Sequence, residues 1–289
     1  TTEEMKKAFS AFDDDTVQNI VVDNSNAIAD TVDTFDIFPK ELFAPTDDFL
    51  ALHGVPSIEK KMVDMVYAKA HSLYGDPLPS IVQDRLDREM RSITENKFST
   101  VYYISHLLVK KSLDEGYLVG SRGSVGSSFV AMLMDITEVN PLSPHYVCPE
   151  CHFASFKMSP EEKETYGIKD EEKGLQTQLE EAISGFDLKD VTCPSCGAPM
   201  KRDGHDIPFE TFLGFKGDKV PDIDLNFSGD YQGRVHEYIR ELFGHEHAFR
   251  AGTISTVASK TAYGYVKGYV EKKDITLRKA EIERRSKMI

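Results

Sequence analysis

The segment Lys219-Val-Pro-Asp-Ile-Asp-Leu-Asn-Phe-Ser228 holds two carboxylates, Asp222 and Asp224, separated by a single apolar residue. Its apolar residues are mostly β-branched or aromatic and alternate with polar ones, a pattern that favours an extended strand. Successive side chains on a strand point to opposite faces, so Asp222 and Asp224 share one face while Ile223 and Leu225 share the other. The segment therefore predicts a strand with a doubly acidic face.

Two carboxylates on one face repel each other unless a cation lies between them. Mg²⁺ takes oxygen ligands and keeps coordination positions for water and substrate phosphate. A pair of such ions about 4 Å apart is the usual apparatus of polymerases and nucleases. The D-x-D segment thus indicates a magnesium site, and the alternative is an edge strand with two solvated acids.

Composition and charge narrow the kinds of protein to which this chain can belong. The 289 residues are 40% hydrophobic and carry a net charge of −14, which suits a soluble protein of one or two domains. No run of 18 apolar residues and no signal peptide occur, so we expect a cytoplasmic protein without a membrane partner. Residues 250–289 carry a net charge of +6 and residues 1–249 a net charge of −20. The basic end either follows a nucleic-acid backbone or forms a solvated helix face.

A glycine- and serine-rich loop follows a strand-like segment at 117–119 and precedes an apolar helical run at 129–134. Its glycines let the backbone approach a ligand, and the start of the helix offers free N–H groups to an anion. Arg122 could add a forked contact. The loop matches neither the P-loop nor the dinucleotide signature. We expect phosphate to bind here, or else a flexible turn; the candidate residues are Gly120, Ser121, Arg122, Gly123, Ser124, Gly126, Ser127 and Ser128.

Four cysteines form two C-P-x-C pairs, Cys148/Cys151 and Cys193/Cys196, separated by 41 residues. Two such pairs can hold one tetrahedral Zn²⁺, which would be structural because four thiolates fill its coordination sphere. The alternative of two disulfides needs an oxidising compartment, which nothing in the sequence indicates. The polar segment 157–183 accounts for the long gap, and we expect it to be an exposed helix or disordered.

Helical periodicity dominates the rest of the chain. Residues 1–45 are helix-rich, and Pro39, Pro45 and Pro56 mark an irregular connector. The predicted elements are helices over 16–32, 57–75, 79–97, 231–243 and 255–272, and a short strand over 248–254.

Taken in order, these motifs resemble the PolC type of bacterial DNA polymerase III, a C-family replicative DNA polymerase. The resemblance is most specific in the two C-P-x-C pairs and in residues 116–128, 203–215, 221–228 and 250–260. It implies an α+β fold: a nucleotidyltransferase-type palm, with a mixed sheet and flanking helices, an inserted zinc ribbon-like knuckle pair with four cysteines, and helical N-terminal and C-terminal segments. It divides the chain into a helical tail of an upstream PHP-type domain (1–45), a first palm part with the phosphate loop (46–147), a zinc-binding insertion (148–200), the palm's catalytic strand and helix (201–250) and the start of a basic thumb (251–289).

The resemblance also implies a function. A DNA-directed DNA polymerase is a nucleotidyltransferase that transfers a deoxynucleotide from a dNTP to a primer 3′-hydroxyl. Asp222 and Asp224 would be catalytic and hold two Mg²⁺ ions, and residues 120–128 would bind the triphosphate. Lys260 and Lys267 would approach the primer–template DNA. The parent protein would also carry an exonuclease and would bind the sliding clamp and other replisome subunits.

The chain departs from the family's pattern in several respects. The family's third metal carboxylate comes from a strand far downstream, and this chain ends before it, so we expect the isolated chain to be inactive. The family's fingers and exonuclease are also missing from this chain, and residues 284–289 do not follow the expected pattern. Two other functions stay open: a catalytically inactive zinc-knuckle module that binds nucleic acid or a partner, and another nucleotidyltransferase that acts on a small acceptor.

Overall fold

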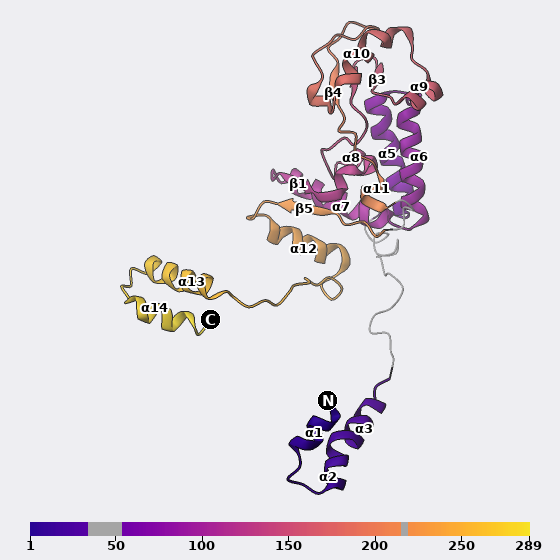
Figure 1. Cartoon of the computed structure of the whole chain (residues 1–289). Helices are drawn as coiled ribbons and strands as arrows, with labels where there is room; N and C mark the ends of the chain where they lie inside the picture. The colour runs from indigo at the N-terminus through magenta and orange to yellow at the C-terminus, as the bar shows by residue number, and fades with distance from the viewer. Residues whose placement is uncertain (34–53, 215–218) are drawn as a thin grey trace. The chain divides into compact units, whose positions relative to one another are not determined.

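The computed structural model describes residues 1–33, 54–214 and 219–289, which form helices and short strands (Figure 1). The chain divides into two compact units, Thr1–Pro45 and Thr46–Ile289. Pro39, Pro45 and the start of the segment 46–147 lie outside the described residues. Within them, no helix combines the length and the apolar character that crossing a membrane requires.

The described part of the first unit, residues 1–33, is helical, as its sequence predicts. Helix α1 (Thr2–Ala8) begins with a capping box in which the Thr1 hydroxyl accepts a hydrogen bond from the Glu4 backbone N–H. Helix α2 (Asp14–Gln18), a π-helical turn (Asn19–Asp23) and helix α3 (Asn24–Asp30) form one continuous run. This run replaces the single helix predicted over 16–32.

Three long helices supply much of the main core of the second unit: α5 (Ile58–Tyr74), α6 (Ser80–Glu95) and α7 (Ser99–Asp114). Their apolar residues recur at helical spacing, so each helix turns one stripe inward. The stripe of α5 shows the spacing clearly: its buried residues are Ile58, Met62, Val66, Ala70 and Tyr74. The predicted break between the first two helices is confirmed at Gly75–Pro79.

Helix α8 (Phe129–Leu133) begins at a buried carboxylate. Glu89 of α6 is fully buried and accepts hydrogen bonds from the backbone N–H groups of Phe129 and Val130, at 3.0 and 3.1 Å. The Ser128 hydroxyl donates to the same carboxylate at 2.9 Å. Glu89 therefore occupies the position at which a helix start would otherwise bind an anion.

Arg85 completes this network. Its guanidinium pairs with Glu89 and donates hydrogen bonds to the Ser127 carbonyl oxygen at 2.6 Å and to the Ile207 carbonyl oxygen at 3.1 Å. A buried carboxylate requires such a partner, because an unpaired charge in the core costs several kcal/mol. The network thus joins α6 to the end of the glycine loop and to residue 207.

The strands among the described residues form two small sheets. Strands β1 (Val119–Arg122) and β5 (Asp224–Phe227) pair antiparallel, and between β1 and α8 lies a 3-10 turn (Gly123–Ser127). The second sheet has the order β3-β2-β4, and its antiparallel strands are β2 (His145–Val147), β3 (Ala154–Phe156) and β4 (Lys201–Asp203).

Residues 148–200 fold around a small core of their own. Between strands β3 and β4 in the sequence, the chain forms two helices, α9 (Pro160–Tyr166) and α10 (Lys173–Glu181). It also forms two 3-10 turns, at Asp170–Glu172 and Gly185–Asp187. Leu175 and Leu179 of α10 pack with Tyr146, Leu188 and the two buried cysteines, Cys148 and Cys193. The helical prediction for 157–183 is confirmed in part, but full exposure is wrong because α10 buries its apolar stripe.

A buried polar network connects this region to α5. The Tyr74 hydroxyl lies 3.1 Å from His145 Nε2, and the Asn140 amide donates to that hydroxyl and to Asp203 at 3.0 and 2.8 Å. His145 Nδ1 lies 2.8 Å from the Ser143 carbonyl oxygen. Burial lowers the pKa of His145, so the ring is neutral: Nδ1 donates to the carbonyl and Nε2 accepts from Tyr74.

The described residues after β4 form four helices: α11 (Glu210–Leu213), α12 (Gln232–Phe243), α13 (Ser259–Lys272) and α14 (Lys279–Ser286). The helix predicted over 231–243 is confirmed. The strand predicted over 248–254 is wrong, since this segment has no regular structure and no described strand pairs with it. The last predicted helix begins at Ser259 instead of 255.

We expect Glu89→Ala to lower the free energy of unfolding by about 3–5 kcal/mol, because it leaves Arg85 and two helix N–H groups without their buried partner. Urea denaturation of the chain measures the change. The matched control is Glu95→Ala, an exposed glutamate of the same helix, which should change stability by less than about 0.5 kcal/mol. Equal losses in the two variants would contradict this role of Glu89.

Candidate functional site

Asp224 opens strand β5 and points away from the core. Its neighbours Ile223 and Leu225 both pack against the main core, so the side chain between them faces solvent and is 45% exposed. Asp222 precedes the strand and is exposed. The observed strand is shorter than the segment 219–228 that the sequence predicts, because only residues 224–227 have a pairing partner in β1.

Strand pairing brings the glycine loop to this carboxylate. Arg122 lies opposite Asp224 in the β1–β5 ladder, and its Nη2 atom is 3.3 Å from Asp224 Oδ2. Gly123 follows with a φ of 77°, and a Cβ atom at that position would lie 3.8 Å from Asp224 Oδ2. Two motifs that are 102 residues apart in sequence therefore meet at one point.

The second half of the loop is buried, and its polar groups already form hydrogen bonds within the protein. Ser127 and Ser128 are buried; the Ser127 hydroxyl donates to the Ser124 carbonyl oxygen at 2.7 Å, and Ser128 binds Glu89. Gly126 packs against Val139. The expectation that the following helix offers free N–H groups to phosphate is wrong, because Glu89 and Ser128 accept them. A ligand can reach the first half of the loop, at Arg122, Gly123 and the half-buried Ser124.

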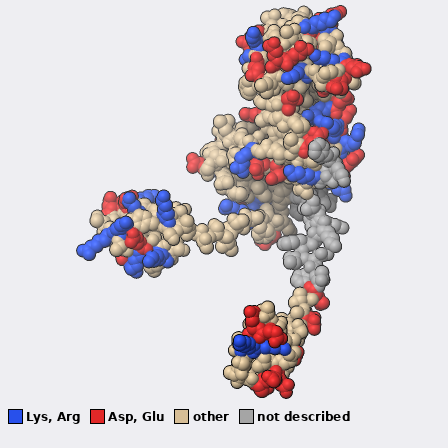
Figure 2. Space-filling model, viewed as in Figure 1, with Lys and Arg blue, Asp and Glu red and all other residues tan. Residues whose placement is uncertain are grey.

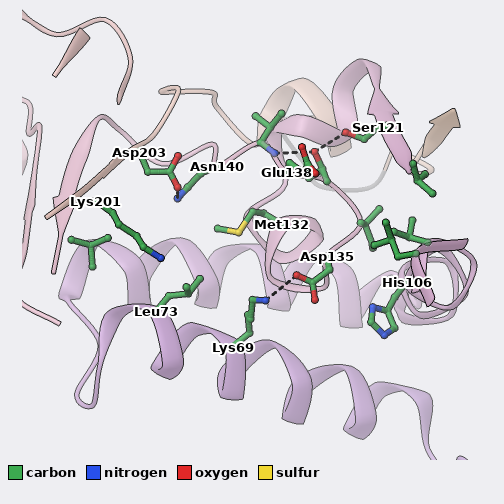
Figure 3. Close-up of a pocket in the computed structure, with 18 of the residues that line it drawn as sticks. Lys69, Leu73, His106, Ser121, Met132, Asp135, Glu138, Asn140, Lys201 and Asp203 are labelled. Atoms are coloured by element: carbon green, nitrogen blue, oxygen red, sulfur yellow. Dashed lines mark hydrogen bonds and ion pairs between the residues drawn. The ribbon is translucent and has the colours of Figure 1, made fainter. Parts of the chain in front are cut away.

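Ser121 faces the opposite side of the ladder from Asp224. Its hydroxyl lies 2.7 Å from the Thr137 hydroxyl, and together with Gly120 it lines a cavity of about 1010 Å³ (Figure 3). Neither Asp222 nor Asp224 lines this cavity.

Two pairs of charged or polar side chains at this cavity contact each other. Lys69 contacts Asp135 at 2.9 Å, and the Asn140 amide donates to Asp203 at 2.8 Å (Figure 3). Since the carboxylates of the D-x-D segment are elsewhere, the cavity is not the candidate catalytic site.

The four cysteines converge as their spacing predicts. Their sulfur atoms all lie within 4.8 Å of one another, and the pairs Cys148/Cys196 and Cys151/Cys193 are each 3.5 Å apart. A tetrahedral Zn²⁺ with Zn–S bonds of about 2.3 Å requires sulfur atoms about 3.8 Å apart. All four thiols are free and form no disulfide, so the cluster has the ligand set and spacing of a metal site.

Both C-P-x-C turns have the same backbone hydrogen bonds. The N–H of Cys148 donates to the Phe153 carbonyl oxygen and that of Cys193 to the Ala198 carbonyl oxygen, at 2.8 and 2.7 Å. The residue after each second cysteine, His152 or Gly197, has positive φ. Burial raises the pKa of the Cys148 thiol, but the N–H groups of the turn and the neighbouring Cys196 and Cys151 thiols outweigh it and lower that pKa to about 7. For Cys196 the Ala198 N–H lowers the pKa, but contacts with the other thiols outweigh it and raise the pKa to about 12, so without a metal the cluster shares its protons unevenly. His152 and His205 contact carbonyl oxygens outside this cluster.

Lys260 and Lys267, the predicted DNA-binding residues, are exposed on helix α13. Lys267 pairs with Glu271 at 3.7 Å. Helices α13 and α14 pack against each other, and blue Lys and Arg side chains gather around this helical pair with fewer red acidic ones (Figure 2). The basic charge of residues 250–289 is therefore displayed on a helical surface.

The sequence interpretation missed two residues near the candidate site. Glu89 belongs to no sequence motif, and its burial could not be expected, because a glutamate on a polar helix is normally exposed to solvent. Asn226 was detectable in principle, because strand alternation places it on the same face as Asp224.

Comparisons with known proteins agree with these motifs. A family model described as the bacterial DNA polymerase III alpha NTPase domain matches residues 60–287. The PolC-type DNA polymerase III of Bacillus subtilis is 51% identical over 284 residues, and those of Halalkalibacterium halodurans and Lacticaseibacillus paracasei are 52% and 53% identical. Each alignment covers 98% of this chain and 18% of the relative, so the chain spans less than a fifth of these proteins. Because the family model covers most of the sequence, the chain belongs to the bacterial DNA polymerase III alpha family.

Proposed function

We propose that this chain is the metal- and nucleotide-binding part of a replicative DNA polymerase with a nucleotidyltransferase-type palm. The polymerase would transfer a deoxynucleotide from a dNTP to a primer 3′-hydroxyl. One observation carries the proposal: the β1–β5 ladder places Arg122 3.3 Å from Asp224, so a cationic, glycine-flanked turn lies beside an exposed carboxylate. Phosphate and its magnesium counter-ion need such a combination.

Asp222 and Asp224 would hold the catalytic Mg²⁺ through their carboxylate oxygens, which are the donor type this ion prefers. Two Mg²⁺ ions, when bound, would acidify the primer hydroxyl and neutralise charge on the triphosphate. The protein would mainly position the reactants and supply fixed charge.

Arg122 would change partners when the nucleotide binds. Both side chains of its ion pair with Asp224 are exposed: 68% of the Arg122 side chain and 45% of the Asp224 side chain are accessible to solvent. Exposed ion pairs contribute little to stability. The guanidinium can therefore turn to a phosphate with little loss, and it would leave Asp224 to the metal. Gly123 would add a backbone contact to the phosphate and Ser124 a hydroxyl contact. Ser127 and Ser128, which are buried, would stabilise the conformation of the loop.

The cysteine cluster would hold one structural Zn²⁺. The four thiols leave no open coordination position, and the module around them has only a small apolar core. The metal would therefore contribute folding energy to residues 148–200 and would not take part in the chemistry.

The basic helices would contact primer–template DNA through Lys260 and Lys267. Contacts of this kind are independent of base sequence and weaken as salt concentration rises. The sliding clamp and other replisome subunits are further partners that the family membership suggests for the whole polymerase.

Binding of dNTP to the chain, titrated with and without Mg²⁺ and primer–template, tests the proposed function. We expect binding that requires Mg²⁺ and tightens when primer–template is present. Binding that DNA leaves unchanged would favour a nucleotidyltransferase with a small acceptor. Binding of DNA without any Mg²⁺-dependent nucleotide binding would favour a zinc-knuckle interaction module.

We expect Asp224→Asn to reduce turnover at least about 10³-fold in the polymerase that contains this chain, because the neutral amide cannot hold the metal. The melting temperature should not change, since the side chain is exposed. Asp230→Asn, which removes an exposed acid just after the strand, should leave turnover within about twofold. Near-normal turnover of the Asp224 variant in primer extension would exclude this carboxylate from catalysis.

Zinc removal should destabilise the chain. We expect about one zinc per chain by elemental analysis, and a fall in melting temperature of about 10 °C on chelation or in Cys193→Ser. The matched control is Ser195→Ala, an exposed position between the two cysteines of the same turn. A melting temperature that is the same with and without zinc would refute the structural role.

A further inference from the structure

Two residues besides Asp224 and Arg122 lie on the exposed face of the β1–β5 ladder. Asn226 is two positions after Asp224 on the same strand, and Gly120 lies opposite Asn226 as Arg122 lies opposite Asp224. Side chains at such positions share one face. Leu225, between the two polar residues of β5, packs into the core on the other face.

The two ends of this face differ. The reachable part of the glycine loop, at Arg122, Gly123 and Ser124, lies at the Asp224 end of this face, because Arg122 pairs with Asp224. Asn226 and Gly120 lie at the opposite end, about 7 Å further along the strand. Asp224 thus separates a phosphate-binding end from a second polar end.

The second end is open to a ligand. Asn226 is exposed, and its side-chain amide has no hydrogen-bond partner among the residues the structure describes. Gly120 has no side chain, and a Cβ atom placed on it would meet no atom within 4 Å. A ligand could therefore lie over the backbone of Gly120 and contact the Asn226 amide, which is neutral and can donate two hydrogen bonds.

Phosphoryl transfer determines what this ligand would be. The attacking oxygen and the leaving group lie on opposite sides of the transferred phosphorus. If the triphosphate occupies the loop end, its pyrophosphate leaves on that side, and the primer must approach from the Asn226 end. A primer backbone offers phosphate oxygens as acceptors.

Building on the proposed function, we propose that Asn226 positions the primer by donating a hydrogen bond to a backbone phosphate at its 3′ end. A neutral donor suits this position, because a third carboxylate on the face would repel the phosphate. Asn226 is then a positioning residue for the attacking strand and does not hold the metal.

Asn226→Ala in the polymerase that contains this chain tests the proposal. We expect the KM for primer–template to rise about tenfold, since one hydrogen bond to a charged group is lost. The KM for dNTP and the kcat at saturating primer should stay within about twofold. Gln232→Ala, which removes another exposed amide nearby in sequence, should change none of these values. Equal melting temperatures will show that both variants are folded.

Asn226→Asp separates primer contact from metal binding. A carboxylate should repel the primer phosphate, so the KM for primer–template should rise further than in Asn226→Ala, and most at low salt. If Asn226 instead holds Mg²⁺, the aspartate should lower the Mg²⁺ concentration needed for activity and leave primer affinity unchanged, which would overturn the proposal. A change in the KM for dNTP alone, or no change in any value, would also overturn it.

Asp224→Asn, measured alongside, separates a failure of the proposed function from a failure of the proposed role of Asn226. Retained turnover in that variant refutes the proposed function. Lost turnover in Asp224→Asn combined with an unchanged KM for primer–template in Asn226→Ala refutes the role of Asn226 alone.

Discussion

The buried carboxylate of Glu89 at the start of helix α8 is the contact on which the candidate site depends. It accepts the N–H groups of Phe129 and Val130 and is neutralised by Arg85. Arg85 also binds the carbonyl oxygen of Ser127, so the end of the glycine loop is held at a fixed point. Because charge in the core must be paired, this arrangement has few alternatives. The loop can then present only its first half to a ligand.

The ladder that carries the chemistry is small and depends on its surroundings. Two strands of four residues are marginal alone in water. Ile223 and Leu225 attach β5 to the main core, and the stacked rings of Tyr117 and Tyr231, 4.6 Å apart, attach α12 beside β1. A rigid frame thus holds an exposed polar face, which is what a reaction catalysed by position and charge requires.

Local motifs were predictable because a short stretch of chain specifies them. Helices α5 and α6 follow from apolar residues at helical spacing, and the cysteine cluster follows from two identical turns whose hydrogen bonds lie within six residues. The strand predicted over 248–254 failed because a strand needs a partner, and β-branched residues alone do not supply one. The helix start at Phe129 was misread because its anion, Glu89, lies 40 residues earlier.

The sequence by itself determined the kinds of groups present: a paired aspartate segment, a glycine loop with one arginine, four thiols and a basic end. Tertiary structure alone decided how the aspartate segment and the glycine loop meet: Arg122 contacts Asp224 across 102 residues, and Asn226 lies beside Gly120. The physical reason is that strand pairing and the pairing of buried charge act between segments distant in sequence. Residue spacing within one segment carries no information about either.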